Sequence, residues 1–149
     1  MKIETAKLNL LFAWLWILLG FISGMILGMF FRGENWLGGY ASFKRRLYRL
    51  AHVSFFGLGA VNLLFWLSME KISGSELPTE AASWAFIIGG VTMPLCCVIM
   101  AHCRQAHLIF SVPVLSLLAG GILTLLLIYQ SENNFPPALG PQPATHHTP

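Results

Sequence analysis

Three histidines stand where a ligand site inside a helical bundle could form. His52 interrupts a long apolar run, whereas His102 and His107 flank the short connection between two later runs. Histidines on facing helices are a usual way to hold a heme iron through its axial positions. We therefore expect heme b between the helices, with His52 as one ligand and His102 or His107 as the second.

Cations and a glycine near these histidines could accommodate the propionates and the macrocycle of a heme. Guanidinium groups form charge-assisted hydrogen bonds with carboxylates such as heme propionates. The expected propionate partners are Arg45, Arg46, Arg49 and Arg104. Gly59 lies on the same helix face as His52, where a missing side chain would leave room for a flat macrocycle.

A second group of possible ligands is rich in sulfur. It comprises Met93, Cys96, Cys97, Met100 and Cys103. Thioether and thiolate groups suit monovalent copper, and the three histidines together with Cys103 could instead bind zinc. Buried Met and free Cys are also common core residues, so ordinary packing stays an alternative for this group.

No residue pattern in the chain predicts an enzyme. The apolar runs contain no acidic residue, and the whole sequence lacks Asp. Neither a Ser, His and Asp set nor an HExxH motif is present for acid-base or nucleophilic chemistry. We expect an accessory subunit of a larger membrane assembly that binds heme for electron transfer or heme handling. The alternatives are a copper- or zinc-binding membrane protein, or a cofactor-free structural or assembly subunit in which Gly20, Gly24 and Gly28 dock a partner helix. The plainer interpretation of His52 is a hydrogen bond inside the bundle.

Four apolar runs must position these residues. The chain of 149 residues is 56% hydrophobic and 10% charged, which is too apolar for a soluble domain of this size. A helix needs about 20 apolar residues to cross a hydrocarbon core, and the runs 8–31, 47–69, 82–101 and 107–129 are long enough. We expect an all-α, four-transmembrane-helix bundle over residues 1–130, and a disordered, proline-rich exterior tail over residues 131–149.

Positive charge favours one orientation of this bundle. Arg and Lys are more frequent in the first and third connections than at the other end of the runs. By the positive-inside rule these connections face the cytoplasm of a bacterial cell, and both termini lie outside its inner membrane. The same topology puts His52, His102 and His107 at one membrane level.

Small and polar residues inside the runs predict helix packing. Gly20, Gly24 and Gly28 recur every four residues, so they form one glycine seam where another helix could approach closely. Asn62 lies near the middle of its run, where an amide is costly unless it bonds across to another helix. The expected partners are the lipid bilayer and other membrane subunits or further copies of this chain, with no nucleic acid.

Two segments carry a resemblance. RRLYRLAHVSFFGLGAVNLLF and the later MPLCC resemble small uncharacterised four-helix inner-membrane proteins of bacteria. These proteins share an Arg-rich helix entry, a His, glycines and an Asn in one helix, and a Met-Pro pair in another. The resemblance implies that Arg49, His52, Gly59, Asn62 and Pro94 are important, but it brings no activity with it.

Overall fold

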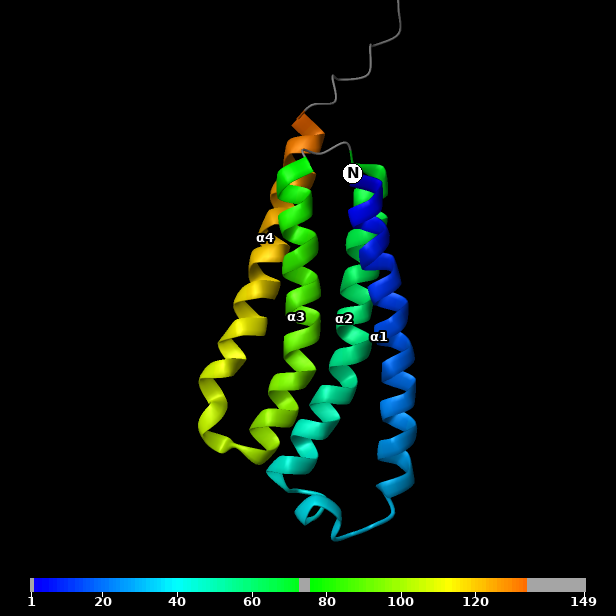
Figure 1. Ribbon diagram of the computed structural model, residues 1–149, viewed down its shortest axis with the longest axis vertical. Coiled ribbons are helices and arrows are strands. Elements are labelled where there is room, and N and C mark those ends of the chain that lie inside the picture. Colours follow the sequence, from blue (N-terminus) through cyan, green and yellow to red (C-terminus); the bar gives the residue numbers. More distant parts are fainter. Residues whose placement is uncertain (1, 73–75, 134–149) are drawn as a thin grey trace, which may run out of the picture.

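The computed structural model describes residues 2–72 and 76–133, which form four long helices and two short 3-10 segments. The elements are α1 (Lys2–Phe30), η1 (Trp36–Gly38), α2 (Phe43–Lys71), α3 (Glu76–His102), η2 (Arg104–Phe110) and α4 (Ser111–Asn133). Figure 1 shows the long helices side by side, with the start of α1 and the end of α4 at one end of the molecule. The segments η1 and η2 lie at the opposite end, so successive long helices run antiparallel.

Each long helix contains a segment that is long and apolar enough to cross a membrane. These four segments are Lys7–Phe30, Phe43–Lys71, Leu77–His102 and Leu108–Ser131. At 1.5 Å per residue, the 29 residues of α2 extend over about 43 Å, which exceeds the roughly 30 Å of a hydrocarbon core. The all-helical fold with four helices of spanning length confirms that part of the sequence prediction.

The start of α2 differs from the predicted start of the second run. The helix begins at Phe43, four residues before Leu47, because Ser42 caps it. The Ser42 Oγ accepts the backbone N–H of Arg45 at 3.2 Å, which satisfies one of the free donors of the first turn. The basic residues are therefore part of the helix rather than of the loop before it.

The start and end of α4 also differ from the prediction. Residues 104–110 form η2, so α4 begins at Ser111 and His107 precedes the helix. The helix continues to Asn133, and residues 131–133 of the predicted tail are thus helical. The rest of that tail, residues 134–149, lies outside the described residues.

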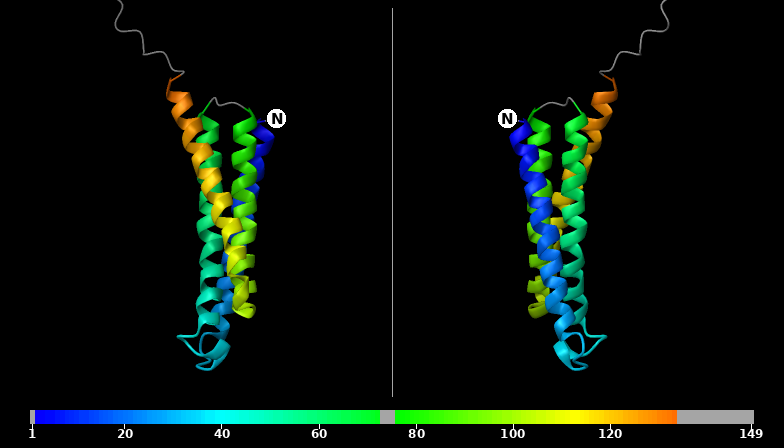
Figure 2. Two further views of the ribbon diagram at one scale, coloured as in Figure 1. Left: turned by 90° about the vertical axis from the view of Figure 1, so that its left-hand side faces the viewer. Right: turned by 90° about the vertical axis from the view of Figure 1, so that its right-hand side faces the viewer.

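The four helices do not pack equally against one another. Extensive contacts join α1 to α2 and α2 to α3, while α4 packs chiefly against α3 and the adjoining η2. Figure 2 shows α4 crossing α3 obliquely. The contact between α3 and α4 is as extensive as that between α2 and α3, so α1 and α4 are the two outer helices of the described part of the chain. Because α1 also contacts α3, we call α1 to α3 the three-helix unit.

Glycines allow α3 and α4 to pack closely. A Cβ built on Gly89 would lie 2.5 Å from Cγ of Leu117, and a Cβ built on Gly120 would lie 3.1 Å from the ring of Phe86. Each helix thus places a large apolar side chain against a glycine of the other. Missing side chains at such positions let helices approach within a membrane.

Candidate functional site

A buried hydrogen-bonded network joins α1, α2 and α3. Asn9 Nδ2 donates to Asn62 Oδ1 at 2.8 Å, and Asn62 Nδ2 donates to the Leu58 carbonyl oxygen at 2.8 Å. The Ser83 Oγ donates to Asn9 Oδ1. Asn9 and Asn62 are both 0% exposed and Ser83 is 1% exposed. The cost of burying these polar groups is offset by hydrogen bonds across helices, so Asn62 has a packing role.

His52 lies in the contact between α1 and α2. Its Nδ1 is 2.9 Å from the Ser23 Oγ, and its ring packs edge-on against Phe56 with 5.4 Å between ring centroids. A Cβ built on Gly24 would lie 2.7 Å from the Cε1 of His52. The imidazole is partly buried and fills the space above a glycine of α1.

Two glycines of the predicted seam face α2 of the same chain. A Cβ built on Gly20 would lie 2.8 Å from Cζ of Phe56, whereas a Cβ built on Gly28 would have no neighbouring atom within 4 Å. The idea that a partner helix docks on all three glycines needs correction, because Phe56 and His52 already cover Gly20 and Gly24. The glycine seam is thus an intrachain contact over most of its length.

Gly59 faces α1 rather than an open space. A Cβ built on this glycine would lie 3.1 Å from the Ala13 carbonyl oxygen and 3.1 Å from Cγ1 of Ile17. The two helix backbones therefore approach closely at Gly59. In this arrangement α1 occupies the space next to Gly59, and the expectation that Gly59 makes room for a macrocycle stays a prediction.

His102 lies at the end of α3 and contacts α2. Its Nε2 is 3.0 Å from the Tyr48 hydroxyl oxygen, and the two rings are perpendicular, with centroids 6.2 Å apart. His52 and His102 thus have different hydrogen-bond partners, on α1 and α2 respectively. Nε2 of His52 faces Gly24 of α1, and Nε2 of His102 is bonded to Tyr48. A heme bound by both histidines through Nε2 would therefore require α1 to separate from α2 and His102 to leave Tyr48. The described residues therefore do not fit a bis-histidine heme between these helices. The side chains of His107 and Arg104 lie outside the described residues.

Arg45 is enclosed by aromatic rings of the first connection. Its side chain is 2% exposed, and its guanidinium carbon lies 4.8 Å from the ring centroid of Phe31, 5.0 Å from that of Tyr40 and 5.7 Å from that of Trp36. The Arg45 Nη2 also donates to the Phe31 carbonyl oxygen at 3.0 Å. Cation–π contacts and a charge-assisted hydrogen bond therefore fasten the connection to α2.

The predicted group of propionate-binding arginines is accordingly divided. The Arg45 side chain is enclosed by the first connection, and its expected contact with a propionate stays a prediction. Arg49 has its guanidinium carbon 5.0 Å from the ring centroid of Tyr40, and Arg46 is exposed. Arg45 and Arg49 thus both contact the Tyr40 ring, whereas Arg46 is exposed.

The sulfur-bearing residues of α3, and Cys103 directly after it, differ in burial and in contacts. Cys96 and Cys97 are buried, whereas Cys103 is exposed at the end of the helix. The Cys96 thiol donates to the Ile109 carbonyl oxygen at 3.4 Å, a contact with η2. Met93 and Met100 are both partly buried. Within residues 2–72 and 76–133, no three His, Cys, Asp or Glu side chains are grouped closely enough to hold a metal ion.

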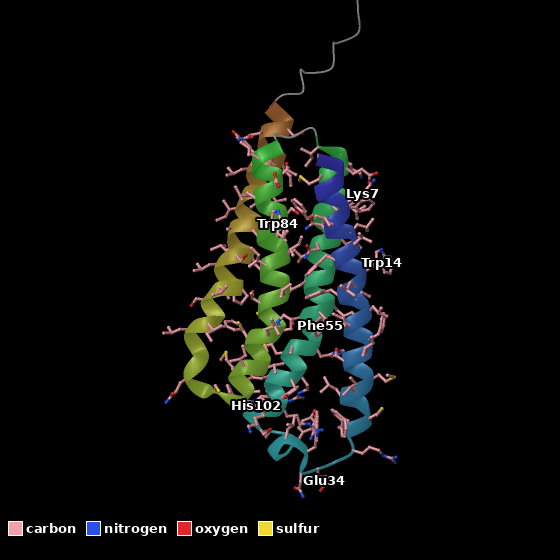
Figure 3. All side chains as sticks on the ribbon, viewed as in Figure 1. Lys7, Trp14, Glu34, Phe55, Trp84 and His102 are labelled. Carbon is pink, nitrogen blue, oxygen red and sulfur yellow. The ribbon has the colours of Figure 1, made fainter. Side chains whose placement is uncertain are left out.

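An open pocket of about 550 Å³ lies at the end of the molecule that carries η1. Its lining comes from the first connection, the first turn of α2 and the last turn of α3, and includes Lys44 and His102. Figure 3 shows His102 at this end of α3 and Glu34 at the tip of the connection, away from the helices. In this pocket polar side chains of separate elements face open space.

Sequence reasoning missed Asn9, Ser83 and Tyr48, which supply hydrogen bonds to the residues it had singled out. Each lies near the end of an apolar run, where polar residues are common and attract no attention. By the predicted run bounds Asn62 lies deeper than Asn9 and Ser83. The longer helices of the structure bring the three residues to one depth. Comparison of the chain with protein-family models, with curated proteins and with solved structures gave no match.

Proposed function

We propose that this chain is a cofactor-free structural or assembly subunit of a larger membrane complex. The main support comes from the surroundings of His52 and Gly59, where the sequence suggested a cofactor. Side chains and backbone of α1 fill this space. The hydrogen bond between His52 and Ser23 gives the imidazole a structural partner. On this view the polar and small residues of the helices set their relative positions and perform no chemistry.

The proposed location is the bacterial inner membrane, crossed four times, with both termini outside the cytoplasm. Support comes from the charges at the two ends of the helices. By sequence, the cations at the η1 and η2 end are Arg32, Lys44, Arg45, Arg46, Arg49 and Arg104, and those at the opposite end are Lys2, Lys7 and Lys71. Basic residues are retained on the cytoplasmic side of membrane helices.

The unequal packing of the helices supports a role within an assembly. Within the chain, α4 packs chiefly against α3 and η2, and α1 packs chiefly against α2. The spanning segments of these two outer helices are each 17% buried, against 39% for the segment of α3. The outer helices therefore offer apolar surface to lipid, to other subunits or to further copies of the chain.

The mass of the protein extracted in mild detergent at its native expression level tests the assembly role. Light scattering that separates protein from detergent is expected to give a protein mass well above the 16.5 kDa of one chain. A particle with the mass of a single chain, in a detergent that keeps the protein folded, contradicts the assembly part of the proposal.

The second candidate function is heme handling at the η1 end, and one observation favours it. His102 is exposed and lines a pocket of about 550 Å³, so one axial ligand could come from this residue. In this reading the heme sits at the end of α3 rather than between α1 and α2. A visible spectrum of the wild-type protein and of His102→Ala distinguishes this candidate, because bound heme would give a Soret band that the variant weakens.

A further inference from the structure

The connection between α1 and α2 has a fixed shape that forms one wall of the pocket at the η1 end. Leu37, Gly38 and Gly39 have φ angles of 55°, 86° and 93°, a region that glycine adopts readily and leucine rarely. The Ser42 Oγ donates to the Leu37 carbonyl oxygen at 2.7 Å, which holds this turn against the start of α2. The aromatic rings of the same connection pack around Arg45. Contacts with Ser42 and with Arg45 therefore both hold this wall in place.

Two nitrogen-bearing side chains line the pocket from separate helices. Lys44 comes from the first turn of α2, and His102 comes from the last turn of α3. Tyr48 lies one turn beyond Lys44 on α2, and its hydroxyl oxygen is 3.0 Å from Nε2 of His102. This hydrogen bond fixes the orientation of the imidazole, and Nδ1 is the ring nitrogen that it leaves available.

The charge around the pocket favours an anion. Its lining contains no carboxylate among the described residues, and Glu34 lies at the exposed tip of the connection (Figure 3). The pocket adjoins the start of α2, whose peptide dipoles add partial positive charge, and the end of α3, whose dipoles add partial negative charge. These two contributions oppose each other, so the positive charge of the pocket comes from the Lys44 side chain.

The other walls of the pocket are apolar. Leu37, Phe43 and Ala101 contribute to the lining, so a bare inorganic ion would leave much of the surface without a partner. A volume of about 550 Å³ lies within the range of pockets that bind organic ligands, roughly 300 to 1,000 Å³. The pocket therefore suits an anionic group that is attached to a carbon-containing body.

We propose that this pocket binds a phosphate ester, with Lys44 and His102 recognising the phosphate and the apolar walls contacting the organic part. The same chemistry is present in the headgroup of an anionic phospholipid and in a soluble phosphate ester. Ammonium groups bind phosphate as point charges, and an imidazole can donate a hydrogen bond to it. The inference stands apart from the structural role, since it concerns a different part of the chain.

Native mass spectrometry of the full chain in a neutral detergent tests the inference. The protein is titrated with dioleoyl phosphatidylglycerol, with dioleoyl phosphatidylcholine as the lipid of equal chain length and no net charge, and separately with glycerol 3-phosphate. The variants are Lys44→Gln, which alters the pocket, and Arg46→Gln, which removes an exposed charge outside its lining. Both sites are exposed, so both variants are expected to fold, and circular dichroism checks this.

The expected result is retention of one anionic ligand by the wild-type protein, with affinity about fivefold or more lower in Lys44→Gln and less than twofold lower in Arg46→Gln. Selective retention of phosphatidylglycerol identifies a lipid as the source. Lys44-dependent binding of glycerol 3-phosphate identifies a soluble ester. Equal losses in the two variants would indicate general attraction to basic residues and would overturn the inference, as would no retention of either ligand.

Discussion

The imidazole of His52 occupies the space that Gly24 leaves open on α1, and a Cβ built on that glycine would lie 2.7 Å from Cε1 of His52. Phe56, one turn further along α2, covers Gly20 in the same way. The pairs match because the helices are antiparallel and both patterns repeat every four residues. A ring on α2 therefore meets a glycine on α1 twice in succession, which fixes the register of the two helices.

Replacing Gly24 by leucine should disturb this register. The new side chain would collide with an imidazole that is held by Ser23, and overpacking of this kind costs about 1 to 3 kcal/mol. The matched control is Gly28→Leu, since a Cβ there meets no atom within 4 Å. The free energy of unfolding, measured with denaturant in mild detergent, should fall for Gly24→Leu and change little for Gly28→Leu. Equal effects of the two substitutions would argue against the contact between His52 and Gly24.

Removing the Asn62 amide should destabilise the three-helix unit. Asn62→Ala leaves Asn9 Nδ2 without its acceptor at a site that is fully buried, and an unsatisfied buried group costs about 1 to 3 kcal/mol. Ser68→Ala on the same helix is the control, because the Ser68 hydroxyl bonds only to Leu64 of its own helix among the described contacts. The difference in unfolding free energy between these variants measures the cross-helix bond. A difference near zero would mean that the network contributes nothing to stability.

The length and apolar character of the helices could be predicted from the sequence, because each run has enough apolar residues to cross a membrane. The need of Asn62 for a partner followed from the cost of a buried amide. Its partners, Asn9 and Ser83, could not be assigned, since many rotations of three helices would satisfy the same run lengths.

The contacts of the site residues could not be predicted from the sequence. Topology predicts that His52 and His102 share one end of the molecule, but the rotation of each helix decides what they face. His52 faces Ser23 and His102 faces Tyr48. Likewise, charge counting treats Lys44, Arg45 and Arg46 as equivalent, although Arg45 alone of these three is buried. Burial of a cation depends on how the aromatic residues of the connection fold over it, which no local pattern reveals.

Replacing Arg45 by lysine should loosen the first connection. Lysine keeps the charge, but it loses the planar stacking on three rings and the hydrogen bond from Nη2 to the Phe31 carbonyl oxygen. A loss of about 1.4 kcal/mol of local stability corresponds to roughly tenfold faster amide exchange. Hydrogen exchange of residues 31–42 is expected to accelerate in Arg45→Lys and to stay unchanged in Arg46→Lys, which alters an exposed position. Unchanged exchange in Arg45→Lys would show that the aromatic cage does not hold the connection.

In the proposed role, His52 packs α2 against α1, and no cofactor lies between these two helices. The most direct measurement compares reduced and oxidised visible spectra, metal content and thermal unfolding of the wild-type protein and of His52→Ala, purified in mild detergent from cells supplied with heme precursor. In this role, both proteins should have the same cofactor content, and His52→Ala should unfold at a lower temperature. The variant loses the hydrogen bond to Ser23, and its alanine no longer fills the space next to Gly24. A near-stoichiometric heme or metal in the wild-type protein that disappears in a folded His52→Ala variant would contradict this role.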